Sequence, residues 1–229
     1  TGEVRVLASA PRHNLSDFVP FMPASVWRRL RTDRRHPLLN GATSGVYAPG
    51  SIFKPVVALA ALDAGVATPE LEIDCPGYYE LPDGRRPRCW NRAGHGPLAL
   101  REALEQSCNV YFMAVALQLG YEPRLREDCV RLGLGQRPGI ELPAAAALLP
   151  SDAWKRRHWK DGWRTGDTAN LSIGQGFLSV TPLQMAVVAA ALANGGAVLR
   201  PRVVLVPPTA ADSVVGRMGW SPAGLRAVR

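Results

Sequence analysis

The sequence contains few lysines, few cysteines and no long hydrophobic run. Of its 27 basic residues only Lys54, Lys155 and Lys160 are lysines, and all the others are arginine. Four cysteines in 229 residues are too few for a disulfide-rich scaffold, which leaves metal, redox or core roles for them. The longest uninterrupted apolar run, residues 185–193, falls well short of the roughly 18 residues that span a membrane. The sequence therefore predicts no transmembrane helix.

The composition is that of a folded domain. Hydrophobic residues make up 47% of the chain, which is enough to bury a core and excludes a disordered protein. No internal repeat or linker divides the chain, so we expect one mixed α/β domain over residues 1–229. The net charge of +8 comes from scattered arginines, with no aromatic-rich RNA motif or helix-turn-helix beside them. We attribute this charge to solubility and expect no nucleic-acid partner.

Apolar periodicity and cap residues predict a largely helical chain. We expect helices over residues 51–64, 98–106, 110–119, 123–132 and 182–194. The last of these has the clearest start, because Thr181 can cap it and Gln184 follows three residues later, as a capping box requires. A further helix begins near residue 221 and looks cut part-way by the end of the sequence at 229.

Strand signals are weaker. Imperfect alternation predicts strands over residues 1–9 and 198–206 and an extended segment over 139–143. The stretch 11–49 is predicted to be irregular, and residues 66–97, rich in proline and glycine, are predicted to be a loop-rich insert.

One short segment has the residues of a nucleophilic site. Pro49 and Gly50 form a turn that delivers Ser51 to the first turn of an apolar helix, with Lys54 three residues later. Residues three apart share a helix face, so Lys54 can reach the Ser51 hydroxyl. A buried lysine with a lowered pKa can serve as a base for serine, whereas arginine stays protonated. A lysine here is informative in a chain that otherwise uses arginine, although Ser-x-x-Lys also occurs by chance as a helix cap followed by a surface lysine.

A second polar motif lies between two predicted helices. Ser107 and Asn109, on either side of Cys108, would supply a hydroxyl and an amide to the opposite wall of a serine site. The alternative is a simple helix break, since Ser and Asn favour caps and turns.

The order and separation of these two motifs resemble the transpeptidase domain of penicillin-binding proteins. Residues 45–51, GVYAPGS, resemble the segment that leads to the nucleophile. Three further segments resemble the class B enzymes: residues 166–168 (GDT), 172–176 (SIGQG) and 180–186 (VTPLQMA). Their amino-acid sequences are most similar to those of the elongation-type branch, penicillin-binding protein 2. The resemblance covers nearly the whole chain.

The resemblance implies a helical lobe beside an antiparallel sheet, incomplete here, and a peptidoglycan D,D-transpeptidase that needs no catalytic cofactor. In this reading Ser51 attacks the penultimate D-Ala carbonyl and Lys54 takes the serine proton. Ser107 relays a proton to the leaving group, and Asn109 holds the substrate backbone. The glycines of residues 173–176 would shape the wall of the site.

The resemblance also implies the setting of the enzyme. Its substrates would be stem peptides ending in D-Ala-D-Ala, and β-lactams would acylate the same serine. Partners would include a membrane glycosyltransferase and other proteins of the elongation machinery. The location would be the outer face of the cytoplasmic membrane, in the periplasm, with an anchor preceding Thr1.

One family motif is missing. No Lys-Thr-Gly or Lys-Ser-Gly tripeptide follows Asn109, because the only later lysines, Lys155 and Lys160, precede Arg156 and Asp161. We therefore expect a fragment that stops before a catalytic strand and turns over poorly. Two other functions stay open: a serine β-lactamase, and a non-catalytic protein that binds muropeptides or a morphogenesis partner.

Three cysteines and a histidine suggest a metal site beside the nucleophile. Cys75, Cys89, His95 and Cys108 fall within 34 positions, and three thiolates with one imidazole suit a closed structural Zn²⁺ site. Such a metal would order the insert and attach it to the loop that carries Ser107. A Cys75–Cys89 disulfide, or thiols that are merely small core residues, are the alternatives.

Overall fold

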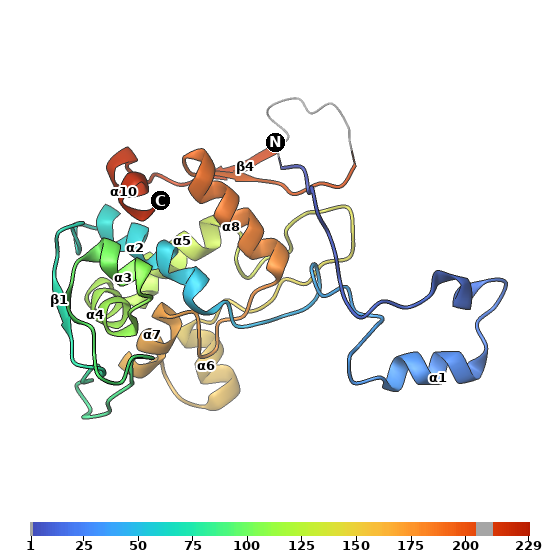
Figure 1. Cartoon of the computed structure of the whole chain (residues 1–229), viewed down its shortest axis with the longest axis horizontal. Coiled ribbons are helices and arrows are strands. Elements are labelled where there is room, and N and C mark those ends of the chain that lie inside the picture. The colour runs from blue at the N-terminus through green and yellow to red at the C-terminus, as the bar shows by residue number, and fades with distance from the viewer. Residues whose placement is uncertain (1, 205–212) are drawn as a thin grey trace.

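Two apolar helices, α2 (Lys54–Asp63) and α4 (Asn109–Leu119), form the centre of the structure (Figure 1). The structure is a computed structural model, and it describes residues 2–204 and 213–229. Helix α2 packs against α4 and α10, and α4 also packs against α7. Around this centre the chain adds short helices and short antiparallel strands. The remaining helices are α1 (Ala24–Thr32), α3 (Leu100–Glu105), α5 (Arg126–Arg131), α6 (Asp152–Trp159), α7 (Thr165–Ser172), α8 (Pro182–Asn194) and α10 (Pro222–Val228).

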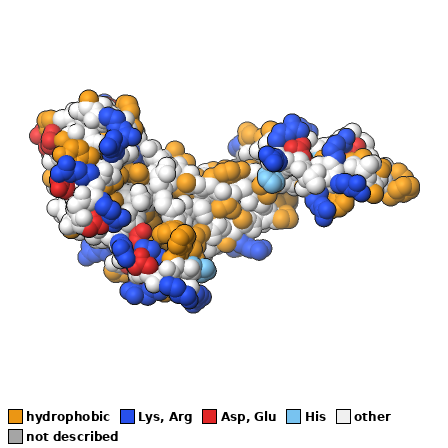
Figure 2. All heavy atoms as spheres, turned by 90° about the horizontal axis from the view of Figure 1, so that it is seen from below, with side chains coloured by type: hydrophobic (Ala, Val, Ile, Leu, Met, Phe, Trp, Pro, Cys, Tyr) orange, Lys and Arg blue, Asp and Glu red, His pale blue; other side chains and the backbone are white. Residues whose placement is uncertain are grey.

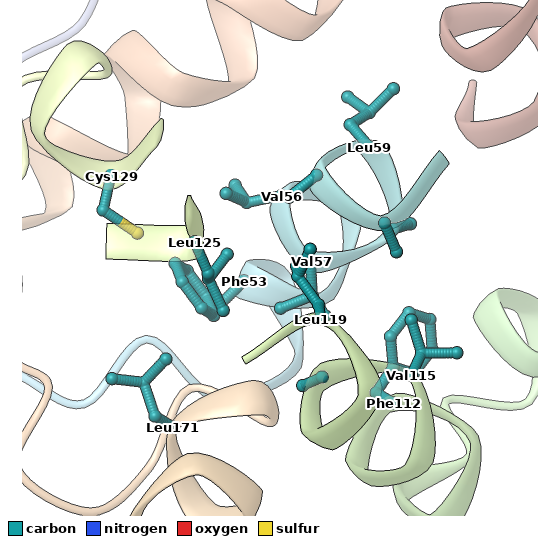
Figure 3. Close-up of a cluster of buried hydrophobic side chains, with 14 of the residues drawn as sticks. Phe53, Val56, Val57, Leu59, Phe112, Val115, Leu119, Leu125, Cys129 and Leu171 are labelled. Carbon is teal, nitrogen blue, oxygen red and sulfur yellow. The ribbon is translucent and has the colours of Figure 1, made fainter. Parts of the chain in front are cut away.

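Helix α2 is buried all round because its sequence is apolar on every face. Each residue from Val56 to Ala61 is at most 4% exposed. Pro55 lies in the first turn, where a missing N–H costs nothing, and Gly65 takes a left-handed φ of 68° just beyond the end. Figure 3 shows side chains of this helix meeting Phe112 and Val115 of α4. The predicted helix over 51–64 is confirmed, as a 3₁₀ turn over residues 50–53 that continues into α2.

Helix α8 starts where the capping box predicts. The Thr181 hydroxyl accepts a hydrogen bond from the Gln184 N–H, and the Gln184 side chain accepts one from the Thr181 N–H. Gly195, in a left-handed conformation, follows the last residue of the helix. The fully buried Thr181 thus satisfies a backbone donor that has no other partner at a helix start.

The sheet content is small and antiparallel. Strand β1 (Ile73–Cys75) pairs with β2 (Gly96–Leu98), so both ends of the predicted insert meet in one short ladder. Strand β3 (Ala197–Leu199) pairs with β4 (Val214–Arg217) and packs against α8. Helices with short antiparallel sheets agree with the mixed fold that the family resemblance implies.

Several strand predictions are wrong. Among residues 2–9 only Glu3 forms a bridge, with Arg202, and no strand within the described ranges pairs with this segment. Residues 139–143, for which the sequence predicts an extended segment rather than a strand, lie outside the strands. The strand predicted over 198–206 ends at Leu199, two residues before Pro201, which has no N–H for a ladder; residues 205–206 lie outside the described residues.

Three helices were not predicted. Helix α1 lies in the stretch expected to be irregular, on an arm formed by residues 10–40 that extends away from the body (Figure 1). Basic and hydrophobic side chains cover this arm (Figure 2). Helices α6 and α7 are short and lack apolar periodicity, and α7 is also rich in poor helix formers. Ser151 caps α6, and α7 is stabilised by burial of residues such as Ala169 and Leu171.

None of the helices in the described part of the chain has the length and hydropathy needed to cross a bilayer.

The cap of α8 gives a test of the fold. We expect Thr181→Ala to lower the free energy of unfolding by about 1–2 kcal/mol, because the buried Gln184 N–H loses its acceptor. Thr181→Ser keeps the hydroxyl and should recover most of the loss. Chemical denaturation of the two variants and the wild type measures both, and equal stability of the Ala and Ser variants would contradict the capping role.

Candidate active site

Ser51 lies at the entrance to α2, exposed to solvent on a 3₁₀ turn. Lys54, the first residue of α2, is only 1% exposed. The two residues are therefore on adjacent turns, with the hydroxyl at the surface and the ammonium group beneath it. This is the arrangement that the Ser-x-x-Lys spacing predicts.

The buried Lys54 side chain donates all of its hydrogen bonds to one loop. Its Nζ lies 2.7 Å from the Ser107 carbonyl oxygen, 2.9 Å from the Ser107 Oγ and 2.9 Å from the Asn109 Oδ1. These three acceptors match the three donors of an ammonium group. The two predicted motifs thus form one site.

Ser107 connects Lys54 to Ser51. Its Oγ is 2.8 Å from the Ser51 Oγ, while Lys54 makes no hydrogen bond with Ser51. The sequence predicted direct contact between the lysine and the nucleophile, but the structure inserts the Ser107 hydroxyl between them. Ser107 has a φ of 51°, which is uncommon for a residue with a side chain and aims the hydroxyl at both partners.

The burial of Lys54 makes its neutral form more accessible than that of an exposed lysine. Burial lowers the pKa of Lys54 to about 8, although the nearby Cys108 and Cys89 oppose this change. The Phe112 ring, whose centroid is 5.5 Å from Nζ, forms part of the apolar wall. Sequence reasoning missed Phe112. The sequence could have indicated it, because Phe112 follows Asn109 by three residues and therefore lies on the same face of α4.

The turn at residues 173–176 supports the backbone of the nucleophile. The Gly50 N–H donates to the Gly174 carbonyl oxygen at 2.9 Å. Gly174 has a φ of 69°, and a Cβ there would overlap the Gly50 carbonyl oxygen. Glycine is therefore required at position 174 for the two backbones to approach each other. The sequence predicts that this turn shapes the site, and this close contact is how it can do so.

The structure brings the predicted Cys and His residues together. The Cys75, Cys89 and Cys108 Sγ atoms and a His95 ring nitrogen all lie within 4.8 Å of one another. His95 Nδ1 is 3.4 Å from the Cys75 Sγ and 3.7 Å from the Cys89 Sγ. All four cysteines are free thiols, so Cys75 and Cys89 form no disulfide. Cys129 lies apart from the cluster and is fully buried in the core.

This cluster touches the loop that binds Lys54. Cys108 lies between Ser107 and Asn109, and the Asn109 N–H donates to the Cys89 Sγ at 3.3 Å. Burial alone would raise the pKa of Cys89. Hydrogen bonds from the backbone N–H groups of Asn109, Asn91 and Val110 have the larger combined effect, so the pKa of Cys89 is lowered. Burial raises the pKa of Cys108 to about 12, so this thiol keeps its proton unless a cation displaces it.

The contact between Gly174 and Gly50 yields a second prediction. We expect Gly174→Ala to slow acylation of Ser51 by a fluorescent penicillin by about 100-fold, because the new methyl group displaces the turn that holds the nucleophile. Gly50→Ala is the matched control. It strains a φ of 62° but meets no atom within 4 Å, and it should cost less. Equal acylation rates in the two variants, at equal melting temperature, would show that the contact does not position Ser51.

Comparison with known proteins identifies relatives of the chain. The chain is 37% identical over 206 residues to the peptidoglycan D,D-transpeptidase MrdA of Acinetobacter baumannii, covering 89% of this chain and 30% of that protein. It is also 37% identical over 207 residues to MrdA of Escherichia coli, covering 90% of this chain and 32% of that one. The chain thus spans about a third of the length of these curated relatives.

Solved structures show the same fold. Penicillin-binding protein 2 of Pseudomonas aeruginosa matches with a TM-score of 0.92 at 37% identity, covering 100% of this chain and 51% of that chain. The sequence profile described as "Penicillin binding protein transpeptidase domain" matches residues 1–215. The chain therefore belongs to the penicillin-binding protein transpeptidase family.

Proposed function

We propose that this chain is the catalytic part of a peptidoglycan D,D-transpeptidase, which cross-links stem peptides through a serine acyl-enzyme. The observation that carries the proposal is the hydrogen-bonded chain from Ser51 Oγ through Ser107 Oγ to the buried Lys54 Nζ. Such a chain can move a proton away from a nucleophilic hydroxyl.

Acylation starts from neutral Lys54. As Ser51 Oγ bonds to the carbonyl carbon of the penultimate D-Ala, its proton passes to the Ser107 hydroxyl, which gives its own proton to the Lys54 amine. The protonated Lys54 then returns a proton through Ser107 to the departing nitrogen. The C–N bond breaks and D-alanine leaves, so the acyl-enzyme forms with no net change in protons. An amine of a neighbouring stem peptide then attacks this ester: the new C–N bond forms, the bond to Ser51 Oγ breaks, and the proton of the amine returns to the serine oxygen. A β-lactam acylates the same oxygen as its ring C–N bond opens.

One backbone amide and one side-chain amide are available to the substrate. The Ser51 N–H lies at the start of a helix, where it can donate to the developing oxyanion. Lys54 fixes the Asn109 Oδ1, and the Asn109 Nδ2 makes no hydrogen bond with any residue in the described ranges. That amide is thus oriented to donate to a carbonyl of the donor peptide.

The wider role is cell elongation. A relative from Helicobacter pylori, penicillin-binding protein 2, has been solved in complex with MreC, and another matched structure belongs to a peptidoglycan synthase complex that coordinates polymerization and crosslinking. We infer that this protein likewise works with a glycosyltransferase and elongation proteins, at the outer face of the cytoplasmic membrane. We also expect residues 1–229, which contain no Lys-Thr/Ser-Gly motif, to be acylated more slowly than a relative that contains this motif.

We further propose that Cys75, Cys89, His95 and Cys108 bind a structural Zn²⁺ ion. A tetrahedral zinc with bonds of about 2.3 Å to sulfur holds its ligand atoms about 3.8 Å apart, close to the spacing of this cluster. The lowered pKa of Cys89 favours the thiolate that a metal needs. The ion would take no part in acyl transfer. It would instead hold the insert against the Ser107–Asn109 loop.

Zinc binding predicts a difference between two cysteine variants. We expect about one zinc per chain by elemental analysis of protein purified without chelator, and less than about 0.1 per chain in Cys89→Ala. Cys129→Ala removes an equally buried thiol outside the cluster and should retain its zinc. Wild-type protein without zinc, with Cys75 and Cys89 joined by a disulfide, would contradict the proposal.

The proton relay predicts how acylation depends on pH. We expect the rate of acylation of the full-length protein by a fluorescent penicillin to rise about tenfold per pH unit below the Lys54 pKa of about 8 and to level off above it, because only the neutral amine accepts a proton. Lys54→Arg should lose about 1,000-fold or more at every pH, since arginine stays protonated.

Lys160→Arg makes the same substitution at an exposed position and should retain the wild-type rate and profile. A flat pH profile in the wild type, or an active Lys54→Arg variant, would exclude Lys54 as the base.

A further inference from the structure

The insert presents an alternating set of basic and aromatic side chains beside the candidate active site. Arg88, Trp90 and Arg92 are exposed, whereas Cys89 between them is buried in the metal cluster and Asn91 is half-buried. The chain pairs with Tyr78 at Arg88, bends at Trp90 and Asn91 and turns at Arg92, so the outward direction of the three side chains follows from their exposure. The same segment therefore anchors itself inward through Cys89 and directs two guanidinium groups and an indole outward.

Trp90 is held in place although it is 63% exposed. Its Nε1–H donates to the Gln106 carbonyl oxygen at 2.9 Å, and its ring meets the His95 ring at a centroid distance of 5.3 Å. Gln106 directly precedes Ser107, whose hydroxyl contacts the nucleophile. The hydrogen bond and the ring contact therefore fix the indole next to the loop that carries Ser107, while much of the ring stays open to solvent.

The two arginines beside Trp90 line a basic hollow. The hollow has a volume of about 320 Å³ and is lined by Gly77, Tyr78, Arg86, Arg88 and Arg92. No acidic side chain lines it, and Glu80 pairs with Arg86 at 3.1 Å outside that lining. Neither Arg88 nor Arg92 makes an ion pair or side-chain hydrogen bond within the part of the chain that the structure describes.

The backbone is built to bring these arginines together. The Cys89 N–H donates to the Gly77 carbonyl oxygen at 2.8 Å, and Tyr78 pairs with Arg88 in an antiparallel bridge. Gly77 has a φ of 95°, and a Cβ there would overlap the Arg92 carbonyl oxygen. Glycine at this position permits the close contact that places Arg92 beside the Tyr78–Arg88 pair.

We propose that Arg88, Trp90 and Arg92 form a subsite for an acidic donor peptide, one that carries a free carboxylate upstream of its D-Ala-D-Ala end. The guanidinium groups bind the carboxylate, for which their planar donor pattern is suited, and the indole packs on the peptide backbone. The inference rests on the proposed transpeptidase function and extends it, because it assigns a substrate charge to a surface outside the Ser51–Lys54–Ser107 chain.

The test compares two donor pentapeptides that differ in a single charge, one with a free side-chain carboxylate and one with the corresponding amide. D-Alanine release by the full-length protein gives KM and kcat for each. We expect Arg88→Ala/Arg92→Ala to raise KM about tenfold for the acidic donor and less than about twofold for the amidated donor, with kcat unchanged. We expect Trp90→Ala to raise KM for both donors, since backbone packing does not depend on that charge.

Two variants serve as matched controls. Arg28→Ala/Arg31→Ala removes the same charge from the arm that extends away from the body (Figure 1), and Trp159→Ala removes an indole that is 61% exposed on α6. Neither should change either KM by more than about twofold. Acylation by benzylpenicillin should stay at the wild-type rate in both control variants.

An equal KM change for the two donors in Arg88→Ala/Arg92→Ala, or no change for the acidic donor, would overturn the subsite. Failure of benzylpenicillin and both peptides to react with the wild-type protein would instead overturn the proposed function, so the two failures are distinguishable.

Discussion

The site depends on the burial of one ammonium group. Removing a lysine from water costs several kcal/mol unless its donors are satisfied, and Lys54 finds all three of its acceptors on residues 107–109. This requirement fixes the loop: Ser107 adopts a left-handed φ, and α4 begins at Asn109. The same burial that must be compensated also lowers the pKa of Lys54 and so prepares it to accept a proton.

The rest of the structure holds Lys54 and the loop of residues 107–109 in position relative to each other. Helix α2, apolar on every face, packs against α4, so Lys54 and Asn109 lie on the facing ends of two buried helices. The Gly174 turn supports the nucleophile from its other side. Cys89 accepts a hydrogen bond from the Asn109 N–H, so the insert also restrains the loop. The proposed metal would thus stabilise the loop without touching substrate.

The sequence predicted the fold class and which candidate residues lie together better than it predicted the individual strands. Ser51 and Lys54 share a helix face by spacing alone, and Thr181 with Gln184 marked the start of α8, because both signals are local. The four proposed metal ligands were found from residue type. That Ser107 stands between Lys54 and Ser51 depends on a tertiary contact and one unusual φ, which no spacing encodes. Helix α7 was missed for a related reason, since burial rather than helix propensity stabilises it.

The most direct test is to measure the pKa of Lys54 itself. The scarcity of lysine helps, because protein labelled with ¹³C at the lysine Cε gives a simple NMR spectrum, and the Lys54 resonance is the one lost in Lys54→Arg. The account predicts that this resonance titrates near pH 8 and that Ser107→Ala, which removes one acceptor and the link to Ser51, shifts the titration. Titration at the ordinary lysine value of about 10.4, unchanged in Ser107→Ala, would contradict the account.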